Sequence, residues 1–112
     1  MTKIETTITY TRPSVDTPFY TTSDQGIAEV ARLGAAGSVL RVASKSGVHQ
    51  DDPLKMSFVT EFQTLSDYTD FQANQIILDE AKRRDAYNKE HNITKEFSKR
   101  EYEDLEYYEE DE

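Results

Sequence analysis

Cysteine and tryptophan are absent from this 112-residue sequence, which also has only four glycines and three prolines. Without cysteine, the chain has no disulfide, no zinc–thiolate site and no thiol nucleophile. No apolar stretch approaches the roughly 20 residues of a membrane-spanning helix, and the N-terminal MTKIETTITY lacks an apolar run of signal-peptide length. We therefore expect an intracellular, cytoplasmic protein with no membrane partner.

Basic residues are missing from the C-terminal stretch EYEDLEYYEEDE, which holds eight acidic residues. Residues 1–100 have 14 acids against 13 bases, so this stretch supplies most of the net charge of −9. An acidic chain repels the phosphate backbone of nucleic acids, whereas a basic protein partner is compatible with it. We predict one domain over 1–100 and an acidic tail over 101–112. Tyr102, Tyr107 and Tyr108 are candidate partner contacts, and packing or a solvated, disordered tail is the alternative.

Hydrophobic residues are also scarce, at 36% of the chain. A single small domain of this composition buries a modest core. Sharing apolar faces in a homodimer would offset that shortage, so we expect a homodimer formed through sheet faces or edges.

Alternating side chains predict that the chain begins with a β-strand. In residues 3–12, Ile4, Ile8 and Tyr10 point to one side, and mostly threonines point to the other. Pro13 has no N–H to donate to a neighbouring strand, so the strand ends there. We expect part of the apolar side to be left wet in a monomer, which is a further reason to expect the dimer.

The remaining chain switches between helical and extended patterns. A short helix is predicted to begin at a Thr22 cap and to stop within GAAG, at Gly34 or Gly37. A longer helix is predicted over residues 66–90, capped by Ser66 or Thr64. Further strands are expected over 38–46, 54–62 and 93–102. A helix is the alternative for the last strand, because its apolar residues also follow a helical stripe.

This order, β-α-β-β-α-β, is the ferredoxin-like α+β plan, with an antiparallel sheet and two helices on one face. The segment MSFVTEFQTLSDYTDFQ within it, a strand followed by a helix that begins with acidic and aromatic residues, resembles the dimeric α+β barrel superfamily. The resemblance implies two sheets packed face to face across a two-fold axis. Members of that superfamily include cofactor-free monooxygenases, haem-degrading enzymes and non-catalytic binding proteins, and the fold alone does not choose among these functions.

A second resemblance comes from TRPSVDTPFY near the N-terminus and AYNKEHNIT at the end of the long helix. These two segments are similar to small uncharacterised proteins of tailed bacteriophages. The resemblance implies a phage context, with the host cytoplasm as compartment, and no assigned activity.

Arg12 and Tyr10 are candidate ligand-binding residues because both lie toward the end of the first strand. If their side of the strand faces a sheet–helix pocket, the Arg12 guanidinium can bind a carboxylate or phosphate with two hydrogen bonds. If the chain turns at Pro13, the guanidinium reaches solvent or pairs with Asp16, which is the commoner outcome at a strand end.

His49 is the third candidate, in the loop GVHQDDP beside Asp51 and Asp52. A metal site needs ligands that converge from several positions, whereas these are consecutive in one turn, so we predict no metal. No Ser–His–Asp order with usable geometry and no glycine-rich phosphate loop is present, so no catalytic residue and no cofactor is assigned.

Two functional hypotheses follow from the sequence. The first is a non-enzymatic interaction or structural accessory protein, phage-encoded, that contacts its partner through the acidic tyrosine-rich tail. The second is a small-molecule-binding or cofactor-free monooxygenase-like domain that uses Tyr10, Arg12 and His49. The sequence favours the first, because the histidines are not placed in a pocket by their spacing.

Overall fold

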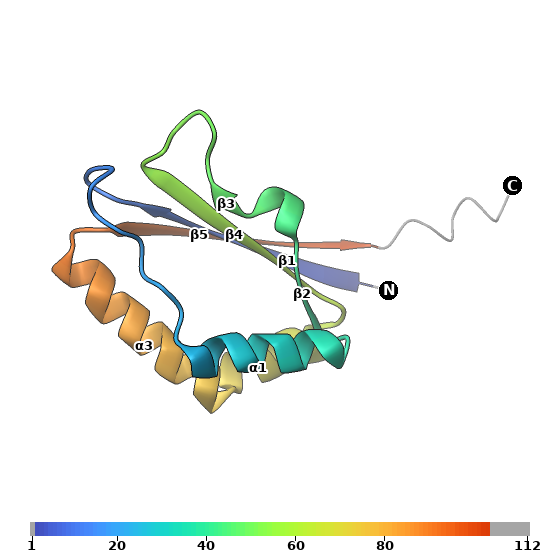
Figure 1. Ribbon diagram of the computed structural model, residues 1–112. Helices are drawn as coiled ribbons and strands as arrows, with labels where there is room; N and C mark the ends of the chain where they lie inside the picture. The colour runs from blue at the N-terminus through green and yellow to red at the C-terminus, as the bar shows by residue number, and fades with distance from the viewer. Residues whose placement is uncertain (1, 104–112) are drawn as a thin grey trace, which may run out of the picture.

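A computed structural model describes residues 2–103 of the protein. In these residues, five strands form one antiparallel sheet with the order β2-β4-β1-β5, and β3 adds to β4. The helices lie together on one face of the sheet (Figure 1). The elements are β1 Thr2–Thr11, α1 Asp24–Ala35, β2 Val39–Arg41, the short 3-10 helix η1 Ala43–Lys45, β3 Gly47–Val48, β4 Lys55–Phe62, α2 Leu65–Ala73, α3 Gln75–Glu90 and β5 Thr94–Glu103. This is the ferredoxin-like α+β fold, as predicted.

The first strand occupies the middle of the sheet. β1 pairs with β4 from Ile4 opposite Phe62 to Thr11 opposite Lys55, and it pairs with β5 along its whole length. β1 ends at Thr11, shortly before Pro13, because proline has no N–H to donate to a neighbouring strand. We call the side of the sheet that carries the helices the inner face and the opposite side the outer face.

The side of β1 that we expected to be partly wet faces the helices instead. Ile4 is fully buried, Tyr10 is 5% exposed, and Ile8 is half-buried on the inner face. The outer face of β1 carries mostly threonines and charged residues. The prediction that Ile4, Ile8 and Tyr10 leave an open apolar face was therefore wrong, because the helices cover that face. The homodimer itself stays a prediction.

The second predicted strand, 38–46, is broken into β2, η1 and β3. Ser46 lies at the break: its hydroxyl donates to the Val42 carbonyl at 2.8 Å and accepts from the Val59 N–H at 3.0 Å. Gly47 follows with a φ of 124°, a backbone conformation that favours glycine. The predicted strand over 93–102 is confirmed as β5, and it continues to Glu103, past the predicted start of the tail.

The predicted helix over 66–90 is two helices that meet at Asn74. The Asn74 backbone is extended, with φ −69° and ψ 119°, so the helical path stops there. Its side-chain oxygen accepts hydrogen bonds from the N–H groups of Ile76 and Ile77 at 2.9 and 3.2 Å, which caps α3. Thr64 caps α2, as one of the two predicted alternatives.

The cap of the first helix also differs from the prediction. Ser23, rather than Thr22, accepts the hydrogen bond from the Gly26 N–H at 3.2 Å. α1 stops before Gly37, where φ is 83°, and Asn92 leaves α3 with a φ of 56°. None of the helices within residues 2–103 is long and apolar enough to span a bilayer.

The tightly packed core lies at one end of the space between sheet and helices. Ile4, Val39 and Phe62 form its buried centre. The Phe62 ring contacts Tyr68 and Phe71 of α2, with centroids 5.2 Å away in both pairs. This core holds α2 on the sheet, and the space between α3 and the sheet lies beyond it.

Candidate functional site

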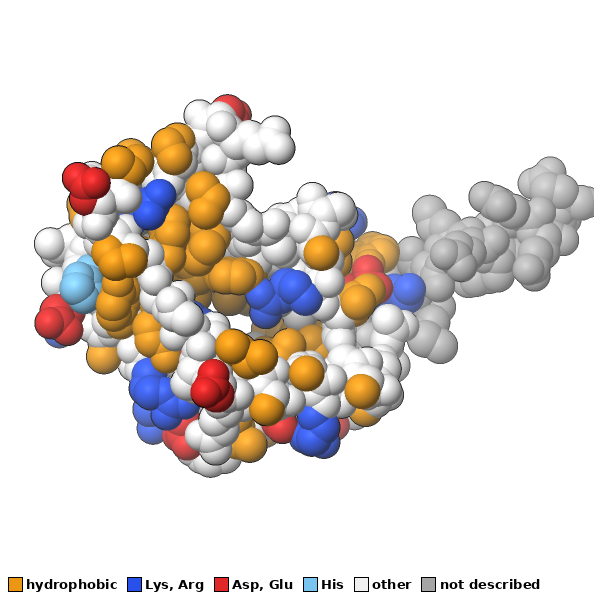
Figure 2. Space-filling model, in the orientation of Figure 1, with side chains coloured by type: hydrophobic (Ala, Val, Ile, Leu, Met, Phe, Trp, Pro, Cys, Tyr) orange, Lys and Arg blue, Asp and Glu red, His pale blue; other side chains and the backbone are white. Residues whose placement is uncertain are grey.

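A cavity of about 410 Å³ lies between the inner face of the sheet and the helices, a volume within the usual range for small-molecule sites. The space-filling view shows hydrophobic side chains around a hollow in this face of the molecule (Figure 2). Its apolar wall comes from five elements, β1, β4, β5, α2 and α3, and includes Ile8, Phe58, Phe71, Ile77, Leu78 and Phe97. The cavity continues the core, because Phe62, Tyr68 and Phe71 belong to both.

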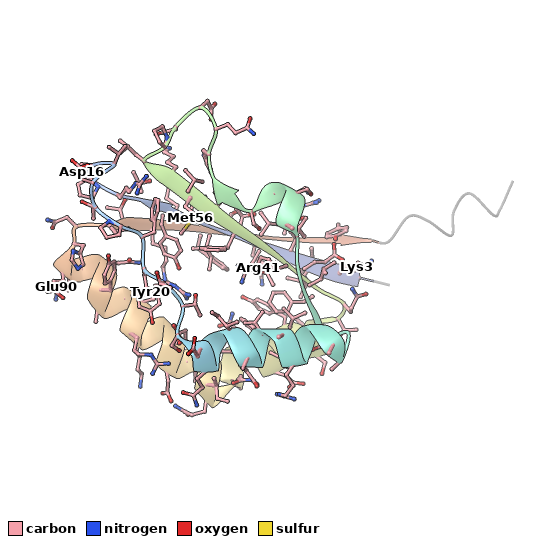
Figure 3. All side chains as sticks on the ribbon, in the orientation of Figure 1. Lys3, Asp16, Tyr20, Arg41, Met56 and Glu90 are labelled. Carbon is pink, nitrogen blue, oxygen red and sulfur yellow. The ribbon has the colours of Figure 1, made fainter. Side chains whose placement is uncertain are left out.

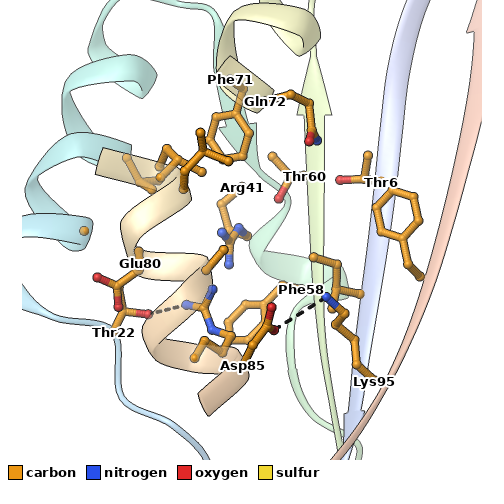
Figure 4. A pocket seen from close by; sticks show the side chains of 18 of the residues that line it. Thr6, Thr22, Arg41, Phe58, Thr60, Phe71, Gln72, Glu80, Asp85 and Lys95 are labelled. Atoms are coloured by element: carbon orange, nitrogen blue, oxygen red, sulfur yellow. Dashed lines mark hydrogen bonds and ion pairs between the residues drawn. The ribbon is translucent and has the colours of Figure 1, made fainter. Parts of the chain in front are cut away.

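Arg41 brings a positive charge into this cavity. It follows Val39 by two residues on β2, so both side chains point to the inner face, and it lies opposite Thr60 of β4. Its guanidinium carbon stands 4.7 Å from the centre of the Phe58 ring. Figures 3 and 4 show Arg41 directed from the sheet toward the helices.

The Arg41 side chain keeps an exposed surface, although protein atoms stand close around its guanidinium. Burial lowers the pKa of Arg41, and the positive charge of Arg84 lowers it further. Among the described residues, no carboxylate forms an ion pair with Arg41. The guanidinium therefore remains available to an anion.

Arg84 of α3 faces the same cavity from the other side. Its Nη2 donates to the Thr22 hydroxyl at 2.9 Å, and its guanidinium carbon lies 5.2 Å from the centre of the Tyr20 ring. Both partners belong to the segment before α1. Within residues 2–103, Arg84 likewise has no acidic side chain in an ion pair.

The charges of both arginines act on the Tyr10 phenol. Burial raises the pKa of its phenol, while the charges of Arg84 and Arg41 act in the opposite direction. Its ring meets Phe58 edge to face, with centroids 6.2 Å apart. Tyr10 thus offers the cavity a neutral hydroxyl donor near two cations.

Glu80 is the buried acid of the site, with 3% of its surface exposed. It accepts hydrogen bonds from the Tyr20 hydroxyl at 2.5 Å, from the Ser23 hydroxyl and N–H at 2.5 and 3.0 Å, and from Arg83 at 2.7 Å. Burial by itself would raise the pKa of Glu80, but these hydrogen bonds outweigh it and lower the pKa to about 2. Glu80 is consequently a fixed, satisfied anion that joins α3 to the start of α1.

Asp85 of α3 and Lys95 of β5 form a second charged pair at the cavity. Their side-chain atoms are 3.7 Å apart, and both side chains are largely exposed. Figure 4 shows this pair bridging the helix and the strand beside Phe58. Lys95 therefore already has an acidic partner, unlike Arg41 and Arg84.

Of the three predicted ligand-binding residues, only Tyr10 lines the cavity. Arg12 donates from Nε and Nη2 to the Pro53 carbonyl, at 3.1 and 2.7 Å, and from Nη1 to the Thr17 carbonyl at 3.1 Å. Its guanidinium also lies 4.4 Å from the Phe19 ring centre. Arg12 thus holds two loops together at the strand end, rather than pairing with Asp16.

His49 lies at the outer face. Its Nε2 is 2.7 Å from the Ser57 hydroxyl, which also contacts Thr9 at 2.8 Å. The sheet therefore separates His49 from the cavity, and the predicted trio of Tyr10, Arg12 and His49 is not brought together. In the part of the chain that the structure describes, no three metal-ligating side chains converge.

Of the predicted partner contacts, Tyr102 lies in β5 and its hydroxyl donates to the Glu61 carboxylate on the outer face. The Arg100 guanidinium carbon also lies 4.4 Å from the centre of the Tyr102 ring. Burial, reinforced by Glu61, raises the pKa of Tyr102 to about 12. Tyr107 and Tyr108 lie outside the described residues.

The sequence analysis missed Arg41, Arg84 and Glu80. For Arg41, a signal existed: it stands two residues from Val39 in an extended segment, so both must share a face. For Glu80 and Arg84, the spacing of four along one helix places them on one side of α3, but nothing in the sequence tells which side faces the sheet.

Fold and site together define a ferredoxin-like α+β domain with a cavity between its sheet and its helices. No protein-family model matches the sequence, and no curated protein does. Among solved structures, the chain is similar to two proteins named "putative antibiotic biosynthesis monooxygenase". The protein from Deinococcus radiodurans has 13% identity and a TM-score of 0.48, over 90% of this chain and 91% of the other. The protein from Nitrosomonas europaea has 14% identity and a TM-score of 0.46, over 92% and 91%.

A Shewanella oneidensis protein is similar at 12% identity and a TM-score of 0.43, over 90% of this chain and 94% of its own. The resemblance to phage proteins stays a prediction.

Proposed function

We propose that this protein binds a small, largely apolar molecule in the cavity between its sheet and its helices. This is the second of the two hypotheses raised by the sequence, with Arg41 and Arg84 in place of Arg12 and His49. The observation that carries the proposal is the cavity itself, about 410 Å³ bounded by aromatic and aliphatic side chains from sheet and helices.

Two contacts that anchor the helices support a binding cavity rather than a region of incomplete packing. Glu80, with its full set of hydrogen bonds, fixes α3 against the segment that leads into α1. Phe62 fixes α2 on the sheet at the opposite end. The first attachment fixes α3 to the segment that leads into α1, and the second fixes α2 to the sheet, so the helix layer over the cavity is anchored at two points.

Binding without catalysis is the proposal, because the residues around the cavity offer no nucleophile held by a base. Glu80 is already saturated with hydrogen bonds, and the described histidines lie elsewhere: His49 at the outer face and His91 against Tyr87 at the end of α3. A homodimer formed through the outer face, as the sequence resemblance implies, would leave this cavity accessible in each copy.

Titration of the ¹⁵N-labelled protein with 2-naphthamide, a neutral bicyclic probe, tests the proposal. We expect saturable changes in the amide resonances of residues around the cavity, such as Gly26, Thr60 and Phe97. Thr7 and Ser98 on the outer face serve as internal controls and should not shift. A titration in which neither 2-naphthamide nor 2-naphthoate produces saturable shifts near the cavity would show that the cavity is not a binding site.

A further inference from the structure

The cavity contains more positive than negative side chains, and this surplus has no partner among the described residues. Arg41, Arg84 and Lys95 line it together with only two acids, Glu80 and Asp85. Both acids already have cationic partners, Arg83 at 2.7 Å and Lys95 at 3.7 Å respectively. The two arginines are left with contacts to rings and to a hydroxyl.

The two arginines face the cavity from opposite sides. Arg41 comes from the sheet and Arg84 from α3, so a group between them is approached from both layers. Each is held against an aromatic ring, Phe58 for Arg41 and Tyr20 for Arg84, which restricts the long side chain before any ligand binds. Guanidinium groups present paired N–H donors that fit a carboxylate.

We infer that the ligand of this cavity is a monocarboxylate, with its carboxylate held between Arg41 and Arg84 and its apolar body against the aromatic walls. This inference rests on the proposed function and adds the chemical class of the ligand. The Tyr10 hydroxyl supplies a further neutral donor beside the carboxylate.

A single negative charge fits better than two. The two unpaired arginines could pair with either one or two negative charges, so the choice depends on the charge of the whole molecule. The whole chain carries a net charge of −9, which repels a dianion more strongly than a monoanion. A phosphate monoester is therefore the poorer ligand, although it offers the same kind of oxygen acceptor.

The experiment compares three probes with one ring system: 2-naphthoate, the neutral 2-naphthamide and 2-naphthyl phosphate. By isothermal titration calorimetry at pH 7, we expect 2-naphthoate to bind at least about tenfold more tightly than 2-naphthamide, as for hydrogen bonds between charged groups. We expect 2-naphthyl phosphate to bind more weakly than 2-naphthoate. The preference for 2-naphthoate should decrease with salt, because it is electrostatic.

The variants Arg41→Gln and Arg84→Gln should each remove most of the preference for 2-naphthoate while leaving the affinity for 2-naphthamide within about threefold, since the apolar walls remain. Arg100→Gln is the matched control: it removes one positive charge that pairs with Glu5 at the outer face, and should leave the preference intact. Circular dichroism verifies that each variant is folded.

Equal affinity of the wild-type protein for 2-naphthoate and 2-naphthamide would overturn the carboxylate assignment while the proposed binding function stands. Tighter binding of 2-naphthyl phosphate than of 2-naphthoate would overturn the single-charge assignment. A preference for 2-naphthoate that survives both Arg41→Gln and Arg84→Gln would show that these arginines only support the fold.

Discussion

Glu80 shows how one buried side chain fixes the shape of the cavity. Its carboxylate receives hydrogen bonds from the segment before α1 and from its own helix, so two elements distant in sequence are held at a set separation. The approach is close enough to require a glycine: a Cβ at Gly26 would lie 2.8 Å from the nearer Glu80 oxygen. The pair Gly26 and Glu80 is thus a specific contact, and either change should loosen the helix layer.

Stability of the protein should therefore depend on the charge of Glu80. Its pKa is lowered from 4.5 to about 2 in the folded state, so its contribution is fully present above pH 4.5 and is lost as the pH falls toward 2. Glu80→Gln should lower the free energy of unfolding by about 1–3 kcal/mol at pH 7 and by clearly less at pH 3. Urea unfolding at the two pH values measures the difference.

Glu90→Gln is the control for this measurement, because it removes an exposed carboxylate at the end of the same helix. Its effect should be within about 0.5 kcal/mol at pH 7. If Glu80→Gln and Glu90→Gln change the unfolding free energy equally, the hydrogen bonds to Glu80 do not stabilise the fold in the way argued.

At the scale of single residues, Tyr10 was a predicted ligand-binding residue and lines the cavity, whereas Arg41 was missed despite its spacing from Val39 and Arg84 had no signal in the sequence. The reason is physical. A charged residue in an extended segment is normally assigned to the wet face, and Arg41 departs from that rule because its side chain stays partly exposed and lies against the Phe58 ring. A sequence pattern does not reveal a cavity, because a cavity is the absence of packing.

At the scale of elements, the period-two alternation predicted β1 and β4 as strands, and for β5 it favoured a strand while a helix stayed the alternative. The alternation matches the burial most clearly in β1, whose inner face is the more buried, whereas β4 is covered on both faces and β5 is largely exposed. The break at Asn74 was missed because apolar residues keep helical spacing across it, from Tyr68 and Phe71 to Leu78 and Ala81. What decides the break is a tertiary contact: the Asn74 side-chain amide donates to Glu29 of α1 at 2.6 Å, which no local pattern encodes.

Asn74 therefore has two functions, as cap of α3 and as link to α1, and substitutions can separate them. Asn74→Ala removes both and should lower the free energy of unfolding by about 1–2 kcal/mol. Asn74→Ser keeps a capping oxygen and should recover about half of that loss. Thermal unfolding followed by circular dichroism ranks the three proteins, and Gln75→Ala at the exposed neighbouring position is the control. An Asn74→Ala protein as stable as the wild type would mean that the break is imposed from elsewhere.

At the scale of the whole molecule, the chain divides its limited apolar residues between a small core and a cavity wall. The core around Phe62 is at one end, and Phe62, Tyr68 and Phe71 belong both to this core and to the wall of the cavity. Unfilled apolar volume is destabilising, by an amount that grows with the size of the cavity. Retaining such a cavity in a 112-residue chain lowers its stability, and binding of a ligand would offset that loss.

Filling the cavity should therefore stabilise the protein and weaken binding. Ala81 of α3 lines the cavity, and leucine is a good helix former, so Ala81→Leu adds apolar volume there with little change in helix propensity. We expect the free energy of unfolding to increase by about 1–2 kcal/mol and the affinity for 2-naphthoate to fall by about tenfold. Ala86→Leu, at an exposed position of the same helix, should change neither property appreciably. Destabilisation by Ala81→Leu together with unchanged binding would mean that the helix layer packs against the sheet in solution, and the division between core and cavity would then be wrong.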